Sequence, residues 1–115
     1  MTNVYGEKLK LCSKRPLTGY SRDGFCSLDK NDNGTHIVCA VVTEEFLHFT
    51  YNQGNDLITP RNGFFGLVPN DRWCLCVFRW IEAYKNNVAP LIDLNCTSEN
   101  VLAYIPLKIL MQYSI

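Results

Sequence analysis

The pattern of apolar and polar positions predicts three short strands separated by long, turn-rich stretches. Residues 36–42 (HIVCAVV) are almost wholly apolar and rich in β-branched side chains, which indicates a buried strand. Residues 8–11 (KLKL) and 90–95 (PLIDLN) alternate between polar and apolar positions, which is typical of a half-buried strand. Residues 13–33 contain mainly turn-forming residues, so we expect a long ordered loop there.

Helix signals follow the first buried segment. Thr43 is a good N-cap, and the glutamates after it lie in the first turn, where they favour the helix dipole. Gly54 is suited to the position just after a helix end. The sequence therefore predicts a helix over about residues 44–53.

A second helix is predicted from an apolar stripe, with Asn70 or Asp71 as its cap. The stripe consists of Trp73, Val77, Trp80, Ile81 and Tyr84, which recur at helical spacing. Because residues 73–78 are almost wholly apolar, a strand over that segment is the alternative. Ser98 can cap a last helical region, which Pro106 restarts or kinks. These elements predict an α+β fold, with short strands, two to three helices and long ordered loops.

Composition limits the class of protein more than it defines its function. The 115 residues are enough for a single domain over residues 1–115, and 47% are hydrophobic, which allows a real core. Equal numbers of acidic and basic residues argue against binding to nucleic acid or to an anionic membrane. No apolar run is long enough to span a membrane, and the N-terminal residues lack the pattern of a secretory signal. We therefore expect a cytoplasmic protein.

The cysteines have three interpretations. They are Cys12, Cys26, Cys39, Cys74, Cys76 and Cys96. Six cysteines allow 15 disulfide pairings, but a reducing compartment makes disulfides the secondary interpretation. Buried free thiols that fill the core, as at Cys39, are the simplest interpretation. A zinc site built from Cys12, Cys26, Cys39 and His36 is possible but not favoured, because the usual CxxC spacing is absent.

Thiol chemistry is the second hypothesis for function. Cys26 lies in a glycine-rich loop after Arg22 and Asp23, and Cys74 lies in the first turn of the predicted second helix. Either could be a nucleophile, with His36 as the base. Whether the protein is an enzyme stays open.

Other ligand motifs fail on their spacing. Residues 29–34 (DKNDNG) resemble the start of a calcium loop, but the twelfth position is Ala40, where a glutamate is needed. An Asx-rich turn before a strand explains them better. No phosphate-binding glycine motif occurs, so no nucleotide cofactor is indicated and any cofactor is unknown.

Polar residues in the turns, together with the two tryptophans, could line a small pocket. The candidate binding residues are Arg22, Asp23, Asn55, Asp56, Trp73, Arg79 and Trp80. The alternative role of the polar residues is to fix the loops by hydrogen bonds to the backbone.

The chain resembles a mostly bacterial family catalogued as domain of unknown function 2237. The similar stretches are LCSKRPLTGYSRDGFC (11–26), DNGTHIVCAVVTEEFL (32–47), GNDLITP (54–60) and GLVPNDRWCLCVFRW (66–80). Similar proteins have Thr-His where this chain has Thr97-Ser98, and they lack the acidic and amide residues at positions 29 and 31. The resemblance implies a small, soluble, single-domain bacterial protein and no particular activity.

The leading hypothesis is a binding or interaction domain with a polar, loop-lined pocket. Its partner, a small molecule or a protein, is unknown, as is its oligomeric state. The alternatives are a cysteine-dependent enzyme or thiol-redox protein, and a small Cys/His metal-binding domain.

Overall fold

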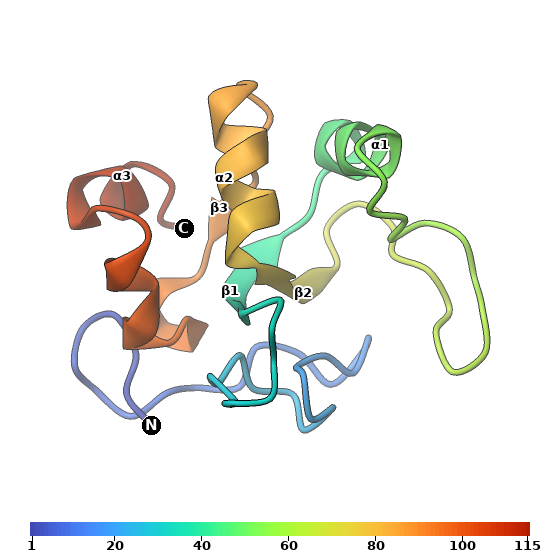
Figure 1. Cartoon of the computed structure of the whole chain (residues 1–115). Helices are drawn as coiled ribbons and strands as arrows, with labels where there is room; N and C mark the ends of the chain where they lie inside the picture. Colours follow the sequence, from blue (N-terminus) through green and yellow to red (C-terminus); the bar gives the residue numbers. More distant parts are fainter.

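A three-stranded antiparallel sheet lies at the centre of the computed structural model, which describes all 115 residues (Figure 1). The strands are β1 (His36–Val41), β2 (Arg72–Cys76) and β3 (Leu91–Ile92), in the order β2-β1-β3. Three helices, α1 (Glu44–Asn52), α2 (Val77–Lys85) and α3 (Leu107–Gln112), lie towards one side of the sheet, and the N-terminal segment lies on the other side. The α+β fold is therefore confirmed.

Strand β1 and helix α1 form where the sequence predicts them. Strand β1 is the central strand, and its four inner residues are buried, in keeping with their apolar character. The Thr43 side chain accepts a hydrogen bond from the Phe46 amide, and α1 ends next to Gly54, whose φ is +93°. Local capping and β-branched composition thus specify both elements.

The second predicted helix begins later than expected. Residues 72–76 form strand β2, which pairs with β1 and leads directly into α2. The predicted helix start at Asn70 or Asp71 is wrong, because this apolar segment is held by residue-to-residue pairing with β1 rather than by local caps. The stripe is helical only from Val77 onwards, where Val77, Trp80 and Ala83 are buried.

Two predicted strands are shorter or absent. Only Leu91–Ile92 pairs with β1, because the Asp93 carboxylate accepts the Asn95 amide and turns the chain into a 3-10 helix, η1 (Leu94–Cys96). Residues 8–11 are not part of a strand: the Leu9 amide donates to the nearby Met1 carbonyl, and the Lys10 amide donates to the Asn95 carbonyl. Ser98 caps the 3-10 helix η2 (Glu99–Ala103), and Pro106 precedes α3, as predicted.

The main core is built around Trp80 of α2. Its side chain is fully buried, stacks on Tyr84 and meets Tyr113 edge to face. Its indole N–H donates to the Pro90 carbonyl at 3.0 Å, so the only polar atom of the side chain is satisfied. None of the helices is long and apolar enough to cross a membrane.

Replacing Trp80 by alanine tests how much this buried side chain contributes to stability. Trp80→Ala should lower the free energy of unfolding by roughly 3–5 kcal/mol, because it removes a large buried side chain and leaves a cavity. Phe78→Ala is the control on the same helix, because Phe78 is 52% exposed; it should cost about 1 kcal/mol or less. Urea denaturation at neutral pH measures both, and equal losses would contradict the assigned role of Trp80.

Candidate functional site

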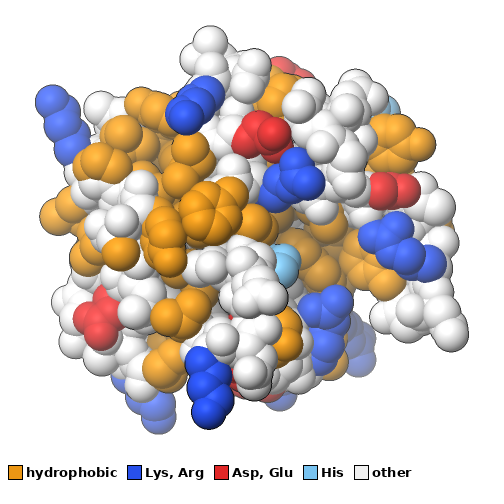
Figure 2. Space-filling view, in the orientation of Figure 1, with side chains coloured by type: hydrophobic (Ala, Val, Ile, Leu, Met, Phe, Trp, Pro, Cys, Tyr) orange, Lys and Arg blue, Asp and Glu red, His pale blue; other side chains and the backbone are white.

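A hollow of about 600 Å³ opens beside the free edge of β2, between the N-terminal segment and the loop after α1. In Figure 2, basic side chains border a depression next to this protruding loop. The lining residues are Gly19, Tyr20, Arg22, His36, Leu57, Arg61, Asn62, Gly63, Phe64, Trp73 and Cys74. Four residues predicted from sequence, Arg22, His36, Trp73 and Cys74, therefore meet at one place.

Two arginines give the hollow a positive character. The Arg22 guanidinium lies 5.1 Å from the centre of the Trp73 ring, and that of Arg61 lies 5.2 Å from the centre of the Phe64 ring. Arg22 makes no ion pair, and the only carboxylate near Arg61 is Asp56, at 3.8 Å. No aspartate or glutamate lines the hollow. The aromatic rings hold both guanidinium groups by cation–π contact; Arg22 has no acidic partner, whereas Asp56 partly offsets the charge of Arg61.

A buried carboxylate orients the imidazole at the hollow. His36 Nδ1 lies 2.8 Å from Asp32 Oδ1, and the Asp32 carboxylate also accepts the backbone amides of Gly34 and His36. Burial alone would raise the pKa of Asp32, but the hydrogen bonds and the charge of His36 outweigh burial and hold this pKa below its ordinary value. With Nδ1 engaged, Nε2 is the nitrogen of His36 left for a ligand.

Two glycines shape the hollow by leaving room. A Cβ at Gly34 would lie 2.3 Å from Cε1 of His36, so the imidazole packs directly against this glycine. A Cβ at Gly19, whose φ is +99°, would lie 2.5 Å from the Phe25 carbonyl oxygen. Side chains at either position would displace the ring or the loop that carries Arg22.

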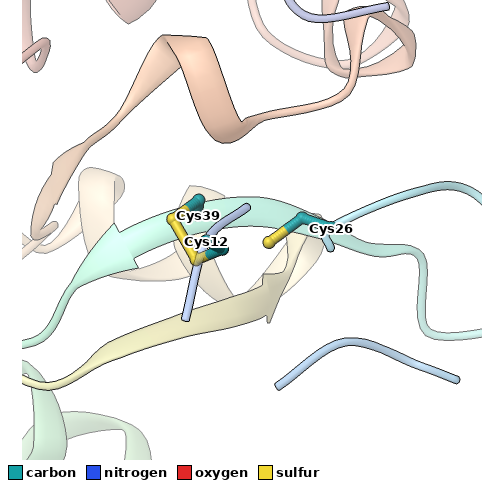
Figure 3. A group of neighbouring side chains, drawn as sticks. All are labelled: Cys12, Cys26 and Cys39. Carbon is teal, nitrogen blue, oxygen red and sulfur yellow. A yellow bond between two sulfur atoms is a disulfide. The ribbon is translucent and has the colours of Figure 1, made fainter. Parts of the chain in front are cut away.

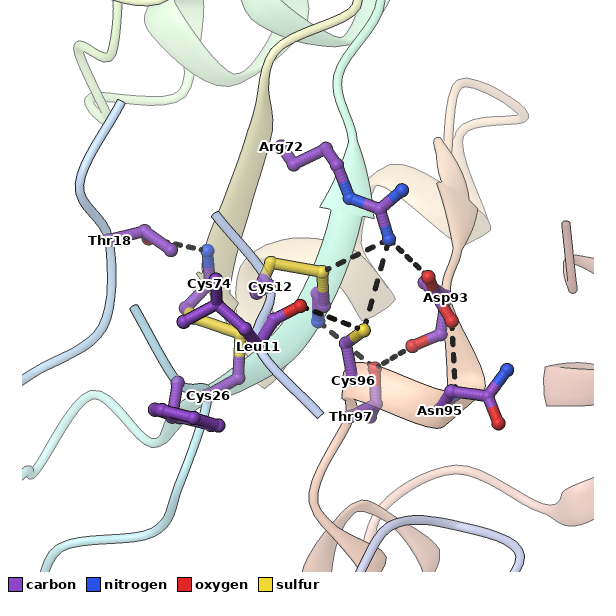
Figure 4. Close-up of a disulfide and its surroundings, with 12 residues drawn as sticks. Leu11, Cys12, Thr18, Cys26, Arg72, Cys74, Asp93, Asn95, Cys96 and Thr97 are labelled. Carbon is purple, nitrogen blue, oxygen red and sulfur yellow. Dashed lines mark hydrogen bonds and ion pairs between the residues drawn. A yellow bond between two sulfur atoms is a disulfide. The ribbon is translucent and has the colours of Figure 1, made fainter. Parts of the chain in front are cut away.

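Four cysteines form two disulfides, Cys12–Cys39 and Cys26–Cys74 (Figure 4). The expectation that the cysteines are free thiols is therefore wrong for these four. The Cα atoms are 5.8 Å and 5.2 Å apart, within the range that a disulfide requires. The chain thus brings these residues together through long-range packing, which spacing along the sequence does not reveal.

The candidate nucleophiles Cys26 and Cys74 are bonded to each other. Cys26 is fully buried and Cys74 is 2% exposed, although Cys74 shares the hollow with His36. Neither is a thiol in this state, so the candidate catalytic set of Cys26, Cys74 and His36 holds no nucleophile until the disulfide is reduced.

Three members of the predicted metal set come together, and the fourth does not. The sulfur atoms of Cys12, Cys26 and Cys39 all lie within 4.8 Å of one another (Figure 3). His36 is not part of this group, because its ring is held at the hollow by Asp32. The cysteines thus form one buried cluster, which Cys74 and Cys96 complete.

Cys96 is the one member of this cluster that is a free thiol. One Arg72 guanidinium nitrogen contacts Asp93 and lies 3.9 Å from Cys39 Sγ and 4.0 Å from Cys96 Sγ (Figure 4). Burial, together with the Asp93 carboxylate, raises the pKa of the Cys96 thiol to about 11. The thiol donates to the Leu11 carbonyl, so Cys96 is a protonated structural group at neutral pH.

The other predicted binding residues lie outside the hollow, and most stabilise turns. Trp80 belongs to the core, and its complete burial leaves no surface for a ligand. Arg79 binds Glu82 and the Gln53 carbonyl, and Asn55 donates to Thr50. The carboxylates of Asp23 and Asp56 accept nearby backbone amides. The sequence did not single out Arg61 and Phe64, although adjacent Arg, Gly and Phe residues in a loop were a visible signal.

Comparison with known proteins identifies the family. A family model described as "Uncharacterized protein conserved in bacteria (DUF2237)" matches residues 2–114, so the chain belongs to this family. A search of the curated proteins finds no match. The resemblance that the motifs suggest is therefore confirmed over nearly the whole chain.

The Asp32–His36 pair predicts a specific acid sensitivity. Because the pKa of Asp32 is lowered by folding, its contribution to stability is present above the ordinary value of 3.8 and is lost as the pH falls through the lowered value. Asp32→Asn should therefore be less stable than wild type at neutral pH, and the difference should shrink below pH 3.8. Thermal unfolding between pH 7 and strong acid measures this difference.

Asp23→Asn is the matched control for this measurement. Asp23 is exposed and its side chain accepts one hydrogen bond, from the Phe25 amide. Its replacement should therefore change the loss of thermal stability at acid pH much less. A difference in thermal stability between wild type and Asp32→Asn that stays constant across the acid range would contradict the role assigned to Asp32.

Proposed function

We propose that this member of the family is a binding domain for a small anionic molecule with a flat apolar part, held in the hollow beside β2. The observation that carries the proposal is the pair of arginines, each stacked on an aromatic ring, in a hollow without any carboxylate. Arginine presents several N–H donors in a plane, which suits carboxylate, sulfonate and phosphate groups. Recognition of charge would therefore come from Arg22 and Arg61.

The apolar part of the ligand would contact the aromatic walls. Phe64 and Trp73 lie with ring centres 5.4 Å apart and tilted planes, and Leu57 lines the same hollow. The volume of about 600 Å³ falls within the range of about 300–1,000 Å³ typical of small-molecule sites. His36 Nε2 would supply a further directional hydrogen bond.

Thiol chemistry is the second candidate function, and one observation favours it. The imidazole held by the buried Asp32 carboxylate lines the same hollow as Cys74, and a base close to a thiol is what activates a cysteine. Reduction of the Cys26–Cys74 disulfide would have to come first, and Cys74 is 2% exposed. Ligand binding requires neither reduction of this disulfide nor exposure of Cys74, so it is the preferred function.

A matched pair of probes tests the preferred function. 1-Naphthoate should bind and raise the melting temperature, whereas its neutral counterpart 1-naphthamide should bind more weakly. Arg22→Gln and Arg61→Gln should each weaken naphthoate binding by roughly 10-fold or more, since each removes a charge-assisted hydrogen bond worth about 1.5–3 kcal/mol. Quenching of Trp fluorescence gives the dissociation constants.

Arg79→Gln is the control, because Arg79 is an arginine outside the hollow. It should leave naphthoate binding unchanged. Equal binding of the two probes, absence of naphthoate binding at millimolar concentration, or an equal loss in Arg79→Gln would each overturn the proposal.

A further inference from the structure

The sheet places two of the buried cysteines directly opposite each other. Cys39 of β1 pairs with Cys74 of β2. The Cys39 amide donates to Thr97 Oγ1 and its carbonyl accepts from Asp93, while the Cys74 amide donates to Thr18 Oγ1. The two cysteines therefore form a pair without mutual hydrogen bonds, the kind in which facing side chains lie closest.

The other two cysteines come from the N-terminal segment, which crosses this face of the sheet. Backbone contacts fix both, since the Cys12 amide donates to the Gly24 carbonyl at 2.8 Å and Cys26 forms a bridge with Thr97. Cys26 Sγ lies within 4.8 Å of the sulfur atoms of Cys12 and Cys39 (Figure 3), and it is bonded to Cys74 Sγ (Figure 4). Four sulfur atoms thus gather from two strands and two loop positions.

We propose that Cys12, Cys26, Cys39 and Cys74 bind one zinc ion through their thiolates when the two disulfides are reduced. Zinc–sulfur bonds of about 2.3 Å place the sulfur atoms of a tetrahedral site roughly 3.8 Å apart. The sulfurs of Cys12, Cys26 and Cys39 already lie within 4.8 Å of one another, and once the Cys12–Cys39 bond is broken, side-chain rotations can separate these two to the required distance. Cys74 Sγ reaches the site by turning away from Cys26 once their bond is broken.

The chemistry of the conversion balances with a dithiol as reductant. Two molecules of dithiol supply four electrons and four protons, which convert the two disulfides to four thiols and leave two oxidised reductant molecules. Zinc binding then replaces the four thiol protons, which are released to solvent. Oxidation of the four thiolates by a disulfide-forming oxidant re-forms the two disulfides and releases the ion.

The surroundings suit a closed structural zinc site. All four cysteines are buried, from 0% to 5% exposed, so water is excluded from the ligand set. Four thiolates and one Zn²⁺ carry two net negative charges, and Arg72 lies 3.9 Å from Cys39 Sγ. Arg72 Nε is buried and has no hydrogen-bond partner, so this N–H is a donor that the disulfide form leaves unused.

The two remaining cysteines serve as internal controls. Cys96 belongs to the same buried cluster, but its thiol donates to the Leu11 carbonyl, and its sulfur is not among those that converge with Cys12 and Cys39. Cys76 is a half-buried free cysteine at the start of α2 and is not part of the cluster. Neither should contribute a ligand.

Metal titration of the whole chain tests the proposal. The protein is reduced with a phosphine under anaerobic conditions and titrated with Co²⁺ and then Zn²⁺. We expect one Co²⁺ per chain, with the intense visible bands of tetrahedral cobalt and strong sulfur-to-cobalt charge transfer. Zinc should displace the cobalt and raise the melting temperature of the reduced protein. Absence of stoichiometric binding by the folded reduced protein would overturn the proposal.

Two serine variants locate the site. Cys74→Ser should weaken cobalt binding by roughly 100-fold or more, and the charge-transfer absorption should lose the contribution of one sulfur ligand. Cys96→Ser should change neither the affinity nor the absorption. An equal loss in both variants would contradict the assigned ligand set. If Cys74→Ser does not fold, alkylation of the reduced wild-type protein decides: zinc should protect the four ligand cysteines while Cys76 still reacts. Cys96 is buried and should react slowly with or without zinc, so only zinc-dependent protection of Cys76 or Cys96, or of no cysteine, would overturn the site.

Discussion

Attachment of the N-terminal segment to the sheet by cysteine sulfurs is the constraint on which the rest of the structure depends. The first 35 residues form no helix or strand, so regular backbone pairing does not hold them in place. The disulfides close loops with sequence separations of 27 and 48 residues, each worth about 3–4 kcal/mol in chain-entropy terms. Total stabilities of domains are about 5–15 kcal/mol, so either cross-link is a substantial fraction. Their loops overlap along the chain, so their effects are not independent.

The shape of the hollow depends on the attachment of the N-terminal segment to the sheet. Arg22 and Gly19 lie between Cys12 and Cys26, and the loop that carries them is pinned to β2 by the hydrogen bond from the Cys74 amide to Thr18. Cys74 is a member of both the cysteine cluster and the wall of the hollow. The cysteine cluster and the loop of Arg22 are therefore joined by a short path of bonded and hydrogen-bonded groups.

Local signals in the sequence specify some elements, and long-range pairing specifies the rest. Helix α1 was predictable because Thr43 and Gly54 mark its two ends, and β1 because its residues are β-branched and apolar. Strand β2 was not resolved from α2, because an apolar run fits either a strand or a buried helix until its partner is known. The disulfide pairing was equally hidden, because six cysteines allow many pairings and only the fold selects one.

The candidate site was also predictable only in part, because local signals identify residue types but not which of them the fold brings together. Arg22, His36, Trp73 and Cys74 have the residue types that suit a site, and the fold brings them together. Trp80 was assigned to a stripe and to a binding surface at once, and its helical spacing with Val77 and Tyr84 pointed to the core, where it lies. Composition alone could not predict that distant loops would bring Arg22 and Arg61 to the same hollow.

A chain with no net charge can still carry a strongly cationic hollow, because hydrogen bonds decide which charges remain free. Asp32 accepts two backbone amides and the His36 ring, and Asp56 accepts the amides of Ile58 and Thr59. These carboxylates stabilise turns beside the hollow and do not line it. The arginines lie over aromatic rings, and Arg22 has no acidic partner, whereas Asp56 also lies 3.8 Å from Arg61. The charge that the hollow presents is therefore set by local turn chemistry and ion pairs, and the net charge of the whole sequence does not reveal it.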